Sequence, residues 1–259
     1  MKKVSAAILV VLMVLWAHAG IANAESAASA PDVGKIQKLR EAIDGSERTL
    51  RQNPQDKEAI KLLSESCERM DKENAHDLET VKLMAIAYHS LASAKIKGTT
   101  KKAIAYLEKA RELSPDDMEL LAYLGSAMTM SARDSWNVVA KLSRVNKGIN
   151  MLDTAVARAP SNIALRMIRG SNSMALPGMF NRKDVALKDF LFVEEMLGKK
   201  PEWNDHDKTL ASSVFYRLGM IYKGKSEEQQ GKSYFERAVK TAPGSFWSSL
   251  AKKELSAES

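Results

Sequence analysis

The stretch FYRLGMIYKGKSEEQQGKSYFERAVKTAP, residues 215–243, places large and small side chains at helical spacing. In its first half, apolar residues stand three and four positions apart beside a glycine: Phe215, Leu218, Gly219 and Tyr222. After a polar break the pattern resumes and ends at Pro243, a residue type that stops helices. This spacing predicts two short helices that pack closely, because small residues let two backbones approach and large ones fill the space between them.

This stretch resembles the tetratricopeptide repeat, a 34-residue unit of two antiparallel helices. With Ser212 as position 1, the eight positions that define the motif hold the expected kinds of residue: Phe215, Leu218, Gly219, Tyr222, Gly231, Phe235, Ala238 and Pro243. Earlier units end in the same way at Pro115 and Pro160. A further unit ends at Gly198, and Pro54 is expected to close a degenerate first unit. The resemblance implies an all-α, right-handed solenoid of about five helix pairs, with a capping helix at the C-terminus.

The same pattern predicts the domain organisation. Residues 1–24 begin with two lysines, continue in an apolar run and end in small residues, which is typical of a bacterial secretory signal peptide. The apolar run is about the minimum length for a membrane span, so a retained anchor is the alternative. Residues 25–34 are expected to form a flexible lead. Residues 35–259 are expected to form the helical repeat domain, because apolar residues recur there at three and four positions without strand-like alternation.

The net charge of +7 is unevenly distributed. Residues 131–188 contain ten lysines and arginines but three acidic residues. This segment also contains two insertions that lengthen the repeats, one between Gly125 and Gly148 and one between Gly170 and Ala186. Insertions in solenoids go to the turns between helices, where they often carry function. We therefore expect this basic segment to contact an anionic partner.

No pattern in the sequence indicates an enzyme. It contains no Gly-x-Ser-x-Gly, no His-Glu-x-x-His and no phosphate-binding glycine loop. His76 and His206 stand among aspartates and are interpreted as parts of polar turns or helix starts, and Cys67 as a small core residue. The many methionines suit a helical core better than a Cu(I) site, and the aromatic residues show no pattern for stacking on bases. We expect no catalytic activity, metal, cofactor or nucleic acid.

The resemblance also implies a binding groove, lined by positions 2, 5, 9 and 12 of the first helix in each repeat. In this sequence those positions hold mainly small, hydroxyl-bearing and methionine side chains: Tyr88, Glu119, Ala122, Ser126, Thr129, Met167, Ser171, Met174, Tyr216, Met220 and Lys223. The register of the unit that contains Tyr88 is ambiguous. Such a lining suits an extended peptide or a helix of a partner.

The insertions supply a second set of candidates. Trp136 and Phe180 are expected to anchor a partner, because aromatic residues and arginines dominate binding hot spots. Basic residues flank them: Arg133, Lys141, Arg144, Arg182 and Lys183. A related hypothesis makes Arg166, Arg169 and Arg182 an anion clamp. The alternatives are that such arginines lay their stems over neighbours and reach solvent, and that the basic residues serve only solubility.

Two functions fit these features. The favoured one is a non-catalytic scaffold, exported to the periplasm or secreted, that binds an acidic segment of a protein or peptide in its groove and basic insertions. The alternative is a periplasmic accessory component of solute or envelope-lipid transport that holds an anionic amphiphile. Once the signal peptide is removed, we expect no stable membrane span. Native mass spectrometry would distinguish the two functions, since one predicts a bound polypeptide and the other a small ligand.

Overall fold

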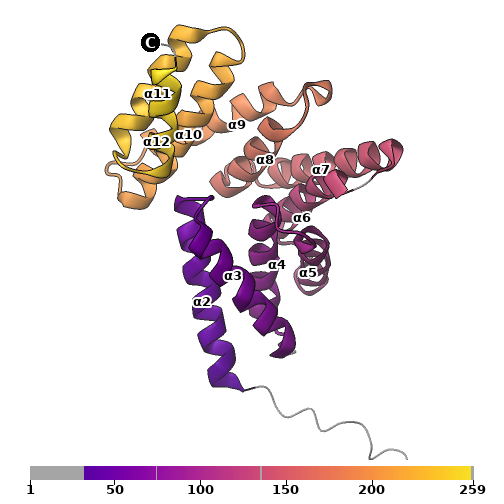
Figure 1. The fold of residues 1–259 in the computed structure, drawn as a ribbon. Helices are drawn as coiled ribbons and strands as arrows, with labels where there is room; N and C mark the ends of the chain where they lie inside the picture. Colours follow the sequence, from indigo (N-terminus) through magenta and orange to yellow (C-terminus); the bar gives the residue numbers. More distant parts are fainter. Residues whose placement is uncertain (1–31, 74, 135, 258–259) are drawn as a thin grey trace, which may run out of the picture. The chain divides into compact units, whose positions relative to one another are not determined.

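The structure is a computed structural model that describes residues 32–73, 75–134 and 136–257, and in these residues it is helical without strands (Figure 1). Three short 3-10 segments accompany the α-helices: η1 (Asp71–Glu73), η2 (Ala132–Asp134) and η3 (Gly178–Phe180). The α-helices are α2 (Val33–Gln52), α3 (Lys57–Met70), α4 (Leu78–Ser93), α5 (Thr99–Leu113), α6 (Met118–Ser131), α7 (Val138–Arg158), α8 (Ile163–Ala175), α9 (Lys183–Gly198), α10 (Asp205–Lys223), α11 (Glu228–Thr241) and α12 (Phe246–Ser256).

The helices pack as five successive pairs: α2 with α3, α4 with α5, α6 with α7, α8 with α9, and α10 with α11. The last helix, α12, packs against both α10 and α11 and buries Trp247. The first helices of the first four pairs also touch in succession: α2 touches α4, α4 touches α6, and α6 touches α8. These contacts confirm the predicted five helix pairs with a C-terminal cap.

A side-chain cap begins the first helix of every pair after the first one. Asp77, Asp117, Asn162 and Asn204 precede α4, α6, α8 and α10, and each accepts a hydrogen bond from a backbone N–H in the first turn of its helix. Ser245 does the same for α12. These bonds satisfy donors that have no partner inside the helix, and each contributes about 1 kcal/mol. The recurring caps keep the start of each repeat in register.

The interior divides into three apolar clusters. The largest joins α2 to α6, a second joins α9 to α12, and a smaller third one lies among α6, α7 and α8. Tyr88, Phe190 and Phe235 are the largest side chains that are almost fully enclosed. Cys67 lies in the first cluster with no exposed surface, which confirms its predicted place in the core, and burial raises the pKa of its thiol.

Close helix contacts occur where the repeat pattern places glycine. Between α6 and α7, a β-carbon added to Gly125 would lie 2.7 Å from the carbonyl oxygen of Gly148, and one added to Gly148 would overlap the carbonyl oxygen of Gly125. Between α10 and α11, a β-carbon on Gly219 would lie 2.5 Å from the ring of Phe235. These positions therefore admit only glycine without movement of the neighbouring helix or, at Gly219, of the Phe235 ring.

The structure corrects two details of the sequence interpretation. Pro54 lies in the turn between α2 and α3, inside the first pair rather than at its end, because proline marks the end of any helix and does not distinguish the two kinds of turn. Val33 and Gly34, expected in the flexible lead, belong to α2. The expected signal peptide and residues 25–31 of the lead lie outside the described residues.

The first insertion is also different from the one expected. It was predicted to lie in a turn, but only residues 132–137 separate α6 from α7, and α7 is 21 residues long while its partner α6 has 14. Much of the insertion therefore lengthens α7 at its N-terminal end. The second insertion does lie in a turn, between Ala175 and Lys183, and contains η3.

Replacing Gly148 by alanine is expected to lower the free energy of unfolding by about 1–3 kcal/mol, because the new methyl group meets backbone atoms that cannot rotate away. Gly45→Ala is the matched control. Gly45 lies inside α2 with nothing within 4 Å of an added β-carbon, so this change is expected to stabilise by about 0.5–1 kcal/mol. Urea unfolding of both variants measures the difference, and equal stability of Gly148→Ala and the parent would contradict the packing at this crossing.

Candidate functional site

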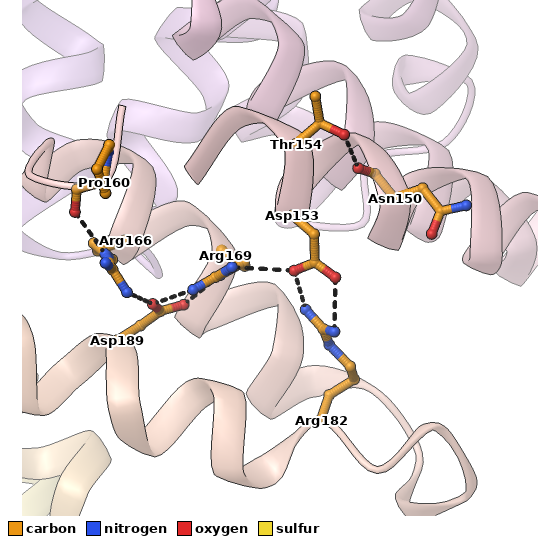
Figure 2. Close-up of polar contacts among 8 residues, drawn as sticks. All are labelled: Asn150, Asp153, Thr154, Pro160, Arg166, Arg169, Arg182 and Asp189. Carbon is orange, nitrogen blue, oxygen red and sulfur yellow. Dashed lines mark hydrogen bonds and ion pairs between the residues drawn. The ribbon is translucent and has the colours of Figure 1, made fainter. Parts of the chain in front are cut away.

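Three arginines of the basic segment pair with two aspartates (Figure 2). Arg166 and Arg169 of α8 both bind Asp189 of α9, at 3.0 and 2.7 Å from its Oδ1. Arg169 also reaches Asp153 of α7, which Arg182 holds with two hydrogen bonds of 2.9 and 2.6 Å. Asp189 has no exposed surface, so a partly buried ionic network of these five residues ties α7, α8 and α9 together.

In this structure the three arginines have carboxylate partners that neither hypothesis included. An anion clamp needs guanidinium groups that are available to a ligand, but Arg166, Arg169 and Arg182 already have carboxylates as partners. They do not simply reach into solvent either, since their side chains are 19, 14 and 13% exposed. Arg166 additionally stacks on the ring of Phe192, at 4.5 Å from its centre. The role of these arginines in this structure is to hold three helices together.

Two further arginines from the predicted partner surface bind backbone carbonyl groups. Arg133 donates to the carbonyl of Ala92, at the end of α4, over 2.9 Å. Arg144 donates to the carbonyl of Ser131, at the end of α6, over 3.1 Å. Carbonyl groups at a helix C-terminus lack partners inside the helix, and a cation there is favourable. Half of the ten basic residues in residues 131–188 therefore have partners within the protein.

A second polar chain links the first helices of three repeats. The Nε2 atom of His89 in α4 lies 2.9 Å from the hydroxyl of Ser126 in α6, and the amide of Asn172 in α8 donates to the hydroxyl of Thr129 over 2.6 Å. Ser126 and Thr129 are 7 and 6% exposed. These two residues were expected to line a groove, but the structure uses them to join neighbouring repeats.

Tyr88 also departs from its expected place on the groove, because its side chain is 2% exposed. Its hydroxyl donates to Asp71 over 2.5 Å, and Tyr106 and Lys102 donate to the same carboxylate, each over 2.7 Å. Burial alone would raise the pKa of Asp71, but the hydrogen bonds from Lys102, Tyr88 and Tyr106 outweigh it and the pKa is lowered. Tyr88 thus belongs to a structural cluster that joins η1 to α4 and α5.

Of the other predicted residues, Ala122 has no exposed surface and does not line a groove, while the rest remain at least partly accessible. Glu119 is exposed, and Met167, Ser171, Met174, Tyr216, Met220 and Lys223 are half-buried. In the insertions, Trp136 and Lys183 are exposed, while Lys141 and Phe180 are half-buried. The groove residues on α8 and α10 lie beside the apolar cluster that joins α9 to α12, whose partly buried members include Met167, Met174, Tyr216 and Met220. A partner-binding role for these residues stays a prediction.

One residue near these positions was missed by the sequence analysis. Arg217, next to Tyr216 on α10, places its guanidinium 4.1 Å from the centre of the Trp247 ring and 5.9 Å from that of Phe190. Its Nη1 donates to the carbonyl of Ser213 over 3.0 Å, and no carboxylate of the described residues lies within ion-pair distance. Burial lowers the pKa of Arg217 to about 10, so the group is charged at neutral pH but poorly solvated.

A buried acid lies in the first helix pair. Glu47 of α2 is 3% exposed, accepts a hydrogen bond from Ser90 over 3.0 Å, and has no partner among the described residues for its Oε1 atom. Burial raises its pKa to about 7, and the bond from Ser90 offsets only part of this effect. The carboxyl group of Glu47 therefore titrates near neutral pH.

The described residues contain no group of three or more His, Cys, Asp or Glu side chains placed to hold a metal ion. His76 instead lies beside Lys109, with 2.8 Å between Nδ1 and Nζ, and His206 is exposed in the first turn of α10. No helix within residues 32–257, as far as they are described, has the length and apolar character of a membrane span.

Comparison with known proteins agrees with this architecture. Residues 212–245 match the tetratricopeptide repeat family, in the register that begins at Ser212. A thermophilic tetratricopeptide repeat protein of Thermus thermophilus superimposes with a TM-score of 0.59 over 85% of this chain and 98% of its own, at 16% identity. Residues 212–245 thus form a tetratricopeptide repeat, and the chain as a whole shares the fold of such proteins. At this identity, the likeness concerns the fold alone.

Other solved structures are similar over comparable lengths. MamA from Desulfovibrio magneticus RS-1 has a TM-score of 0.44 at 16% identity, covering 82% of this chain and 97% of its own. MamA AMB-1 has a TM-score of 0.43 at 16% identity, covering 81% and 98%. Among curated protein sequences, none matches the chain significantly.

Removing the shared carboxylate of the ionic network is expected to be costly. Asp189→Ala leaves Arg166 and Arg169 without their common partner in a partly buried site, and should lower the free energy of unfolding by about 3–5 kcal/mol. Asp184→Ala is the control, since Asp184 lies on the same helix with a 77% exposed side chain and should change stability by less than about 0.5 kcal/mol. Denaturant unfolding tests both, and equal midpoints would contradict the network.

Glu47→Gln is expected to stabilise the protein in a pH-dependent way. The pKa of Glu47 is about 7 when folded and 4.5 ordinarily, so the parent loses stability as the pH rises from about 4.5 to about 7. The variant lacks this loss. Its free energy of unfolding should exceed that of the parent by about 3 kcal/mol at pH 8 and by little at pH 4. Burial lowers the pKa of His89 to about 4, which acts in the opposite sense in both proteins, so only their difference isolates Glu47. A constant difference across this range would contradict the assignment.

Proposed function

We propose that this protein is a non-catalytic scaffold that holds an acidic, extended segment of a partner protein against α8, α10 and α12. The tetratricopeptide repeat fold suggests a protein-interaction scaffold. The leader-like residues 1–24 support export, and we propose the periplasm as the place where it acts. The observation that carries the acidic preference is Arg217, which has aromatic neighbours and no carboxylate partner among the described residues.

A carboxylate supplied by a partner would complete the surroundings of Arg217. Its Nη1 already donates to a backbone carbonyl, while no hydrogen bond occupies its Nε and Nη2 among the described residues. Neither of these two atoms is fully buried without a partner, so both keep some contact with solvent although the side chain is largely buried. The guanidinium edge that they form suits a carboxylate, which binds two N–H groups of arginine side by side. The guanidinium of Arg217 is poorly solvated in the free protein, which costs desolvation free energy. Pairing with a carboxylate of the partner would offset that cost.

The neighbouring side chains suit the rest of such a segment. Tyr216 and Met220 stand on the same helix, and Trp247 of α12 lies beside them, with its ring centre 5.8 Å from that of Tyr216. Methionine adapts its shape to varied ligands, and aromatic rings pack well on extended peptides. Arg144 of α7 and Arg166 and Arg169 of α8 have partners inside the protein. We therefore place the proposed contact on α10 rather than on the insertions.

The proposal is tested by selecting peptides from a random library displayed on phage against the purified protein. Selected peptides are expected to contain Asp, Glu or a free C-terminal carboxylate, and their synthetic forms to bind at least about tenfold more weakly to Arg217→Gln. Arg217→Lys retains the charge but not the two-pronged geometry, and should give an intermediate loss. Binding should also weaken as salt is raised.

Lys232→Gln is the matched control, because Lys232 is exposed on α11 and its loss changes the net charge equally. It should bind like the parent. Melting curves of all variants verify that they are folded. Selected peptides without acidic groups, or equal binding by the parent and Arg217→Gln, would refute the proposed role of Arg217.

A further inference from the structure

The N-terminal end of α7 extends beyond the helix pair to which it belongs. The two helices cross at Gly125 and Gly148, and α6 continues for six residues past the crossing while α7 begins ten residues before it. At 1.5 Å per residue these arms are about 9 Å and about 15 Å long, so α7 projects by about one turn more. Figure 1 shows this end of α7 reaching past α6.

The projecting end is apolar and strongly exposed. Trp136 is 92% exposed, and Val138 and Val139 are 66 and 75% exposed. The described residues expose eight large apolar side chains, and three of the eight lie within these four positions. Asn137 between them caps α7 by accepting a hydrogen bond from the N–H of Ala140, so the apolar residues are held at the start of a formed helix.

Basic residues follow the apolar end, and no acid interrupts them. Lys141, Arg144 and Lys147 stand at intervals of three in α7, and residues 135–152 contain no Asp or Glu. Arg144 donates to the carbonyl of Ser131, which braces α7 against the end of α6 and fixes the direction of the projection. Lys147 is exposed and Lys141 is half-buried.

We infer that this end of α7, residues 136–147, docks on the surface of an anionic lipid bilayer. Tryptophan favours the boundary between headgroups and acyl chains, and the two valines can enter the apolar layer beside it. The lysines, one to three turns further along the helix, would then lie at the depth of anionic headgroups and attract them. The positive charge of the helix end matches the negative charge of such a surface.

A bilayer fits these residues better than a protein does. A stable protein interface buries about 800 Å² on each partner, and one tryptophan with two valines supplies roughly half of that. The three side chains also project from a convex end rather than line a hollow, so a protein partner would have to provide a pocket for each of them. A lipid surface needs no matching pocket. This inference is independent of the role proposed for Arg217.

Vesicle flotation tests the inference with the purified protein from which the expected leader, residues 1–24, has been removed, because that apolar run would bind lipid by itself. With phosphatidylglycerol and phosphatidylcholine in equal parts, the protein should float with the vesicles at low salt, and its partitioning should fall with added salt and on pure phosphatidylcholine. The triple variant Trp136→Ala, Val138→Ser, Val139→Ser should partition at least about tenfold less. Lys141→Gln with Lys147→Gln should show a loss of about tenfold on the anionic vesicles.

Two controls separate docking from general stickiness. Leu62→Ser with Leu113→Ser removes two other exposed apolar side chains, 45 and 50% exposed, and should leave flotation unchanged. Trp136→Phe should still float but lose the blue shift of tryptophan fluorescence that the parent shows on anionic vesicles, so the difference reports insertion of Trp136. The inference is overturned if the parent stays with the soluble fraction, or if the folded triple variant floats as well as the parent.

Discussion

The close approach of two helix backbones at small residues is the constraint on which this architecture depends. At the Gly125–Gly148 crossing each glycine faces the carbonyl oxygen of the other, and at Gly219 the facing group is the ring of Phe235. If the helices lay further apart, Leu152 and Phe235 would lose the neighbours that enclose them. The large residues of the motif fill the space between two helices only when the small residues hold those helices close together. Pairing of helices, burial of the repeat residues and stacking of successive pairs all follow from this geometry.

The buried charged residues of this protein are arranged differently from its apolar residues. The apolar clusters repeat along the array, whereas Asp153, Asp189 and their arginines occur once, where α7, α8 and α9 meet. Burying such ions costs desolvation energy that only well-formed pairing offsets. The network therefore specifies which helices lie next to one another at this point in the array, and it leaves few of the local arginines for a partner.

The fold could be predicted from the sequence because the repeat pattern is local. Phe215 to Pro243 contain both helices of one pair and the residues that hold them together, so one motif is enough to recognise the unit. The side-chain roles could not be predicted as well, because they depend on residues that meet only after folding. Arg169 lies 20 positions from Asp189, and Arg182 lies 29 positions from Asp153. Ser126 and Thr129 fit the pattern of groove residues, but their neighbours across the array, His89 and Asn172, have no place in that pattern. Arg217 lies between the positions that the family uses to mark a groove.

The division of the apolar interior has a consequence for cooperativity. The cluster from α2 to α6 and the cluster from α9 to α12 are separate, and the stretch between them combines a small apolar cluster with the partly buried ionic network. In a linear array each unit contacts only its neighbours, so such a seam is where unfolding of one side can stop before it reaches the other. If unfolding stops there, the array behaves as two blocks joined by the small apolar cluster and the ionic network, and amide hydrogen exchange would sort its helices into two groups of protection rather than one. The ions of that joint are more buried than the surface pairs of either block, so salt screens them less, and the two halves stay coupled at ionic strengths that weaken the surface pairs.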